Sequence, residues 1–158
     1  MILRHIANFC LQHDPALHLL RLEWRPRSHQ HQLRASATQL MALLQELQVR
    51  HLLLDMNSVP DLAVADQLWL GDQWMPDLVA LPLERLVLAI DSGEVHNQLA
   101  IDALHDLVQP AIRFESQYFS DVESAFEWLA DGVPNLPALR AEWAARYLGY
   151  PLSPLGDR

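Results

Sequence analysis

Apolar and polar positions along the chain follow two periods, and the N-terminal part has the pattern typical of β-strands. The stretches Ile2 to Leu11 and Leu17 to Arg25 are apolar and β-rich, and His13-Asp14-Pro15 lies between them. An Asp side chain can bond the backbone that follows it, and Pro fixes a backbone angle that a turn requires. The pattern therefore predicts an antiparallel hairpin.

The period becomes helical from Ser28 onward. Apolar residues then recur every three or four positions, which places them on one side of an α-helix, and Ser28 is available as its N-cap. The residues on this side are Leu33, Ala37, Leu40, Leu44 and Leu47. We expect the first long helix here.

Three apolar runs further along the chain are typical of strands buried on both faces. They are His51 to Met56, Leu83 to Ile90 and Ala111 to Phe119. The helical patterns between them are long enough for the crossovers that parallel strands need. We expect an α/β fold, in which an N-terminal β-hairpin is followed by alternating helices and strands. The sheet should be mixed and mainly parallel, with about five strands and helices packed on it.

Two signals mark the starts of the later helices. Asp91 has Glu94 three positions on, and the run from Ser120 to Glu123 is a capping-box pattern. Gly132 is suited to stop the second of these helices. The core side of that helix should be Val122, Ala125, Phe126 and Leu129.

The chain after Gly132 forms a separate C-terminal part. We expect an α/β domain over 1–132, and a C-terminal helix and tail over 133–158 that pack on the domain or exchange with a second copy. Pro134 and Pro137 bracket the link to this helix. Its apolar residues are Leu136, Leu139, Trp143 and Tyr147, and 151–158 should fray.

Composition and charge narrow the classes of function. The chain has 158 residues, and 51% of them are apolar, which is enough for one core without disulfides or metals. The net charge of −9 disfavours nucleic acid and anionic lipid as partners. Cys10 is the only cysteine, and we find neither a secretory leader nor an apolar run of about 18 residues. We expect a cytoplasmic protein that does not insert into membranes.

Two motifs in the middle of the chain carry a resemblance to a known family. Residues 53–59 read Leu-Leu-Asp-Met-Asn-Ser-Val, and Asp66 to Trp69 is followed by Gln73-Trp74-Met75-Pro76. The first motif resembles the end of a strand in STAS domains, which include the anti-sigma-factor antagonists. The second resembles a bacterial branch of STAS-like proteins of unassigned function. The resemblance runs from Leu17 to Ala130, and it implies a STAS-like fold more than an activity.

The phospho-switch of that family is not carried over. In the antagonists, a partner kinase phosphorylates a serine at the start of the helix after this strand. The matching segment here is Ala63-Val64-Ala65-Asp66, which has no hydroxyl group. Ser58 lies earlier, in the connection, as the candidate for a substitute acceptor, and we expect no phosphorylation there.

No spacing in the sequence identifies a catalytic, cofactor or metal site. Nucleophile elbows, glycine-rich phosphate loops and zinc-protease motifs are all missing, so we expect no enzyme activity and no cofactor. His29 and His31 point in different directions, and His96 and His105 lie on opposite sides of one helix. We interpret them as surface histidines.

Asp55 ends a predicted central strand, at the edge where open α/β sheets place ligands. With Asn57 and Ser58 beside it, we favour a role in capping the next helix or bracing the connecting loop. Cys10 has apolar neighbours, and we interpret it as a small apolar residue.

The predicted second helix has more apolar surface than one contact with a sheet requires. We expect a buried stripe at about 100° per residue that consists of Val64, Leu68, Gly71, Met75 and Leu78. Leu70 and Trp74 then lie about a third of a turn away, and Trp69 is nearly opposite the core. Pro76 should break or kink the helix near Met75.

The first hypothesis of function is a non-enzymatic STAS-like interaction or regulatory module, most simply a homodimer or a partner of another protein. Large aromatic residues outside a core stripe are typical of such interfaces. The interface candidates are Trp69, Leu70, Trp74, Trp143 and Tyr147. The alternative is that the C-terminal helix folds back and covers the tryptophans of the second helix within one chain.

The second hypothesis is a binding protein for a small apolar or lipid-like ligand, held between sheet and helices. Trp69 and Trp74 would also line such a pocket. The pocket candidates are Trp24, Asp55, Asn57, Ser58 and Phe114. A third hypothesis, an enzyme that uses Asp55 with a histidine, requires these two groups to converge in the fold.

Overall fold

The expected hairpin forms between β2 (Phe9–Asp14) and β3 (Leu19–Trp24). The structure is a computed structural model, and it describes residues 1–3, 6–25, 32–131 and 133–148. Asp14 closes the turn, because its carboxylate accepts a hydrogen bond of 3.1 Å from the backbone N–H of Leu17. The sequence signal at His13-Asp14-Pro15 is therefore confirmed.

The first apolar stretch forms two strands instead of one. Residues 6–8 make a turn, and β1 (Ile2–Leu3) pairs antiparallel with β2 on the side away from β3. Asn8 in this turn is buried, and its side chain donates a hydrogen bond of 2.9 Å to the hydroxyl of Ser36. The expectation of one continuous strand from Ile2 to Leu11 is wrong for this reason.

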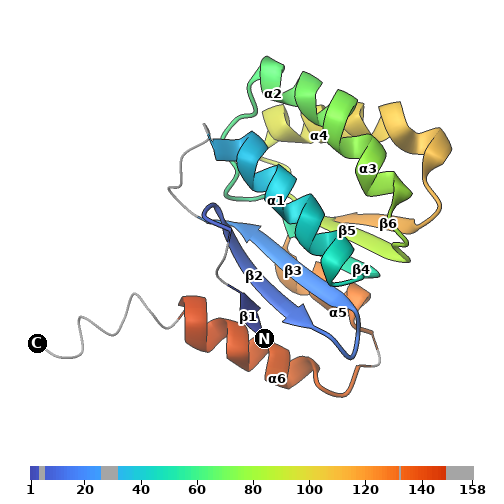
Figure 1. Ribbon diagram of the computed structural model, residues 1–158. Coiled ribbons are helices and arrows are strands. Elements are labelled where there is room, and N and C mark those ends of the chain that lie inside the picture. The colour runs from blue at the N-terminus through green and yellow to red at the C-terminus, as the bar shows by residue number, and fades with distance from the viewer. Residues whose placement is uncertain (4–5, 26–31, 132, 149–158) are drawn as a thin grey trace, which may run out of the picture.

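Three parallel strands continue the sheet beyond the hairpin. They are β4 (His51–Asp55), β5 (Arg85–Ala89) and β6 (Glu115–Phe119). The spatial order of the six strands is their order along the chain, as Figure 1 shows. The mixed α/β fold is confirmed, with one strand more than expected.

The last strand, β6, is not buried on both faces as its sequence predicts. It lies at the edge of the sheet, and its side chains are exposed or half-buried, whereas β4 and β5 are buried along most of their length. The apolar run from Ala111 contributes only its end to the strand, because the turn η3 (Gln109–Ala111) comes first. The pattern of a strand does not reveal that it has only one neighbour.

Helices cover both faces of the sheet (Figure 1). The face drawn uppermost, called the upper face below, carries α1 (Leu33–Glu46), α2 (Val64–Trp69), η2 (Leu70–Trp74), α3 (Met75–Ala80) and α4 (Val95–Val108). The lower face carries α5 (Val122–Leu129), α6 (Leu136–Trp143) and η4 (Ala144–Leu148). Within the described ranges, no helix is long and apolar enough to cross a membrane.

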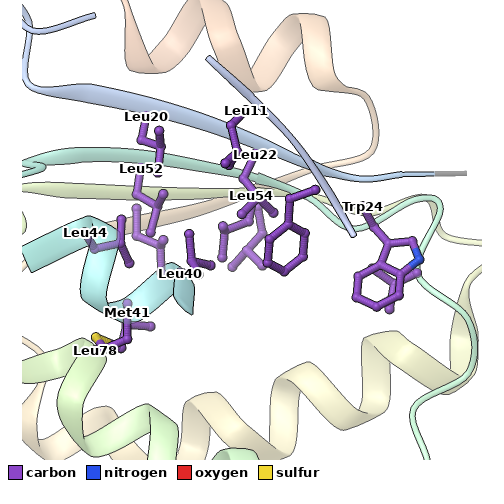
Figure 2. Packing of buried hydrophobic residues seen from close by; sticks show 14 of the residues in the cluster. Leu11, Leu20, Leu22, Trp24, Leu40, Met41, Leu44, Leu52, Leu54 and Leu78 are labelled. Carbon is purple, nitrogen blue, oxygen red and sulfur yellow. The ribbon is translucent and has the colours of Figure 1, made fainter. Parts of the chain in front are cut away.

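Alternate residues of the strands contribute to two separate cores. On the upper face, Leu22 and Leu54 point toward the side of α1 that carries Leu40 (Figure 2). On the lower face, Leu53 belongs to a smaller cluster with Phe126. The predicted apolar side of α1 is confirmed, since Leu33, Ala37, Leu40 and Leu44 are buried.

The helix starts agree with the sequence signals in part. Asp121 is the N-cap of α5, and its carboxylate accepts hydrogen bonds from the N–H and the hydroxyl of Ser124, at 2.8 and 3.0 Å. An N-cap at Asp91 is wrong, because that carboxylate instead accepts from Gly93 and the helix begins at Val95. The predicted signals at Ser28 and Gly132 lie outside the described residues.

Candidate functional site

An apolar cavity of about 140 Å³ lies between the upper face of the sheet and the helices that cover it. Side chains from β2 to β6 form one wall, and side chains from α1, η2, α3 and α4 form the other. Figure 2 shows part of the apolar packing that surrounds this region. The cavity therefore lies inside the larger of the two cores.

Three of the predicted aromatic residues meet at this cavity. Trp24 is 1% exposed and contacts Phe9 edge-on, with ring centres 5.7 Å apart. Trp74 and Phe114 are half-buried and line the same space. The indole N–H of Trp74 donates a hydrogen bond of 2.7 Å to the carbonyl of Ala37, which fixes the ring against α1. These three residues agree with the ligand-binding hypothesis.

The second helix presents only the second half of the expected stripe to the core. Val64 and Leu68 are 70% and 69% exposed, so this part of the prediction is wrong, whereas Gly71 and Leu78 are buried and Met75 lines the cavity as expected. Leu70 and Trp74 also face the cavity. In this segment, regular α-helix gives way to the π-helical turn η2, which shifts the phase of the residues that follow. The core position before the helix is taken by buried Leu62.

Pro76 and Gly71 explain the local form of this segment. Pro76 has no backbone N–H, so regular hydrogen bonding cannot continue through it, and the π-helical turn ends at Trp74, where α3 begins with the next residue. A Cβ atom on Gly71 would lie 3.0 Å from Leu107 and 3.3 Å from Leu104, so the glycine lets α4 approach closely. Single π-turns of this kind are frequent at functional sites.

Three of the lining residues carry polar groups, although the surface that the lining presents to the cavity is apolar. They are His105 of α4 and Ser116 and Tyr118 of β6. Ser116 and Tyr118 are two residues apart and so share one face of the strand. Tyr118 is 38% exposed, and its ring meets that of His105 edge-on at 6.3 Å. Ser116 and Tyr118 were not predicted as site residues from the sequence, and His105 was interpreted only as a surface histidine.

The interface candidates do not form one surface. Trp69 is half-buried beside Arg34, whose guanidinium lies 5.9 Å from its ring centre and also pairs with Asp66 at 3.0 Å. Trp143 is 2% exposed on the lower face, and the Tyr147 ring centre lies 4.6 Å from it. The alternative in which the last helix covers the tryptophans of the second helix is therefore wrong, because it packs on the opposite face.

The polar pocket candidates lie away from the cavity. Asp55 alternates with Leu54 along β4, so it points to the lower face. Its carboxylate accepts a hydrogen bond of 3.1 Å from the N–H of Asn57, and the side chain of Asn57 accepts one of 2.6 Å from Asp91. Neither Asp55, Asn57 nor Ser58 lines the cavity. The geometry agrees with the expected bracing role of Asp55.

Asp55 also belongs to a buried charged group on the lower face. Glu23 is its register partner on β3, and Arg21 lies on the same side of that strand. Burial and the Asp55 carboxylate raise the pKa of Glu23, and Arg21 offsets part of this effect. Burial likewise raises the pKa of Asp55, against the hydrogen bond from Asn57 and the charge of Arg21. No histidine among the described residues takes part, so the convergence that an Asp–His enzyme needs is not found.

Two further predicted features are located by the structure. Cys10 is buried, and burial, followed by the Glu23 charge, raises the pKa of its thiol, which agrees with its interpretation as a small apolar residue. The His96 ring nitrogen lies 3.0 Å from the carbonyl of Leu62. In the part of the chain that the structure describes, no three His, Cys, Asp or Glu residues could hold a metal ion. His29 and His31 lie outside that part.

A second, polar cleft lies at the amino-terminal ends of β4 and β5. His51, Glu84, Arg85 and Asp131 line it, together with apolar residues. Burial lowers the pKa of His51, although Glu84 lies 3.6 Å away. Open α/β sheets bind ligands at the carboxyl ends of their strands, whereas β4 and β5 begin here. The apolar cavity is the stronger candidate site.

The comparisons with known proteins leave the family of this chain open. No family model, no curated protein and no solved structure matches it.

Proposed function

We propose that the protein binds a small apolar molecule in the cavity between the upper face of the sheet and α1, η2, α3 and α4. The observation that carries this proposal is the cavity itself, which has a volume of about 140 Å³ and a lining of mostly apolar side chains. Apolar cavities of about this size stay dry and take up benzene-sized molecules. The ligand is therefore closer to a single ring or a short chain than to a long acyl chain.

Two features of the cavity wall favour ligand binding over the alternative that the cavity is only a packing defect. The wall includes Trp24 and Trp74, and large aromatic side chains provide much of the contact area in ligand pockets. The π-helical turn at Leu70–Trp74 turns Leu70 and Trp74 toward the cavity. Such turns are frequent at functional sites.

The direct test is a titration with benzene and toluene, followed by the indole N–H signals in a two-dimensional NMR spectrum. We expect saturable shifts of the Trp24 and Trp74 signals, while that of Trp143, on the other face of the sheet, stays unchanged. The variant Ala37→Phe places a ring into the cavity wall and should abolish these shifts. Ala35→Phe is the matched control, because Ala35 lies on the same helix and is exposed. Binding that survives in Ala37→Phe would place the ligand elsewhere.

A second candidate is the homodimeric interaction module that the extra apolar residues of the second helix suggested. The observation that favours it is a set of exposed apolar side chains on α2 and α4, namely Val64, Leu68, Val95, Leu99 and Leu107. Native mass spectrometry should then report a dimer for the wild type and a monomer for Leu68→Glu combined with Leu99→Glu. A monomeric wild type would exclude this candidate and leave the ligand-binding proposal intact.

A further inference from the structure

One edge of the sheet is a strand of ordinary length without the usual protection against further pairing. β6 is the last strand in the spatial order of the sheet, so among the described residues it pairs with β5 only (Figure 1). Natural proteins usually protect such an edge with a very short strand, with Lys or Pro, or with a bulge. At the opposite edge, β1 is only two residues long. β6 has five residues, reads Glu-Ser-Gln-Tyr-Phe and runs in continuous register with β5. The unprotected edge is therefore β6.

Two residues of β6 direct their backbone groups away from the sheet. The N–H of Glu115 and the carbonyl of Phe119 form hydrogen bonds with the backbone at the two ends of β5, at 3.0 and 2.8 Å. In a parallel ladder, the N–H and C=O of one residue point to the same neighbouring strand, and this side alternates along the strand. The backbone groups of Ser116 and Tyr118 therefore point outward.

These outward groups can pair with the same groups of a second copy. In an antiparallel ladder, two facing residues whose backbone groups point toward each other exchange two hydrogen bonds. A twofold axis repeats every contact, so that residue i meets j and j meets i. With this axis at Gln117, Ser116 of each copy faces Tyr118 of the other. Both outward residues then have backbone partners.

The charges beside the strand are complementary in this register. With the axis at Gln117, Arg113 of one copy faces Asp121 of the other, just beyond the two ends of β6. Both residues are exposed, and the backbone at Asp121 is extended, as continued pairing requires. The charged residue inside the strand, Glu115, faces Phe119. The register therefore contains two opposite-charge pairs and no like-charge pair.

The neighbouring symmetric registers are less favourable. Moving the axis by one residue to Tyr118 puts Glu115 opposite Asp121, and like charges in facing positions are destabilising. Moving it by one residue in the other direction puts Arg113 opposite an apolar residue. Charge complementarity therefore selects the axis at Gln117.

We propose that the protein forms a homodimer in which the two β6 strands pair antiparallel about Gln117 and join the two sheets into one. This inference goes beyond the proposed function and does not depend on a ligand. It also differs from the second candidate, because its contact is backbone pairing at the sheet edge and not the apolar side chains of α2 and α4. The contact is short, and interfaces below about 1,200 Å² are typical of weak association, so the dimer dissociates on dilution.

The test places charges on the twofold axis. Sedimentation velocity from about 1 μM to about 1 mM protein should show a monomer–dimer equilibrium for the wild type. Gln117 faces itself across the axis, so Gln117→Glu and Gln117→Lys each bring two like charges together and should weaken the dimer about fivefold. An equal mixture of the two variants should recover the dimer, because opposite charges then face each other. A wild type that stays monomeric at every concentration would overturn the proposal.

A matched control separates this contact from a general effect of net charge. Gln39 is exposed on α1, which is not part of this edge, so Gln39→Glu and Gln39→Lys should leave the dimer unchanged. Equal losses in the Gln39 and Gln117 variants, or a Gln117 mixture that does not recover the dimer, would overturn the register. Circular dichroism checks that the variants fold, as expected for a change at exposed Gln117.

The α2 and α4 surface is tested in the same experiment. Leu68→Glu combined with Leu99→Glu should leave the β6 dimer intact. A dimer that this pair dissociates, and that the Gln117 charges do not affect, would assign the interface to α2 and α4 and overturn pairing through β6.

Discussion

The guanidinium carbon of Arg21 lies 3.7 Å from the centre of the Trp143 ring. The Phe126 ring centre is 5.3 Å away, and the Nε atom of Arg21 has no hydrogen-bond partner among the described residues. Two aromatic rings and the charges of Glu23 and Asp55 therefore replace water around this cation. The contact joins the middle of β3 to the end of α6.

Replacement of Arg21 by methionine should lower the free energy of unfolding by about 3 kcal/mol, because Glu23 and Asp55 then stay buried without their cation. Urea denaturation followed by circular dichroism measures the change. Arg50→Met is the matched control, since Arg50 is exposed beside Glu84 and its loss should cost under about 1 kcal/mol. Equal costs would mean that the buried carboxylates do not depend on Arg21.

Trp143→Ala should lower the free energy of unfolding by about 3 to 5 kcal/mol, because the ring is buried and a cavity would replace it. Trp69→Ala removes a half-buried ring and should cost clearly less. Thermal unfolding of the two variants compares them. If the Trp143 variant unfolds at the wild-type temperature, α6 is not an integral part of the fold.

Glu23→Gln should change the pH dependence of stability. The pKa of Glu23 is raised in the folded state, so its stabilising contribution is present at low pH and is lost as the pH rises through that pKa. The variant is neutral at every pH. Its free energy of unfolding, minus that of the wild type, should therefore increase as the pH rises above about 4 and level off once the pH exceeds the raised pKa of Glu23. Glu46→Gln is the control, because Glu46 is exposed and its replacement should change stability little.

Trp74→Phe should cost about 1 kcal/mol, because the carbonyl of Ala37 loses the indole donor while most of the ring remains. Chemical denaturation gives the value. The mass of the native protein should not change, since Trp74 lies in the cavity wall and not on an exposed surface. Trp128→Phe, on the lower face, is the control and should cost less. A change of subunit number in the Trp74 variant would argue for the interface hypothesis instead.

The sequence predicted those parts of the fold that local pattern determines. The hairpin turn at Asp14 and the buried side of α1 were correct, because both depend on residues close together in the chain. The edge position of β6 was not predicted, since it depends on which strand lies beside it. The first half of the buried stripe of the second helix, Val64 and Leu68, was also wrong. Its phase depends on the π-helical turn and on Leu62, which fills the preceding core position.

The candidate site was predicted in its apolar part only. Trp24 and Phe114 line the cavity, because large aromatic residues in an α/β chain gather between sheet and helices. Asp55 was placed in the same pocket, although it alternates with Leu54 and so belongs to the opposite face of the sheet. His105 was interpreted only as a surface histidine. The contact between His105 and Tyr118 joins α4 to the edge strand β6, and residue spacing along the sequence does not predict such a long-range contact.

Because the six strands lie in the order of the chain, the sheet can grow during synthesis, each new unit adding to the edge left by the one before. The upper face of β2 and β3 is covered as soon as α1 has been made. Their lower face is covered much later, because its contacts come from α6, near the end of the chain. The side chain of Gln12 donates a hydrogen bond to the carbonyl of Leu139, and the guanidinium of Arg21 lies against the ring of Trp143. A ribosome-bound chain therefore exposes a charged and apolar face until its last helix emerges, and exposed apolar surface of this kind favours aggregation before folding is complete.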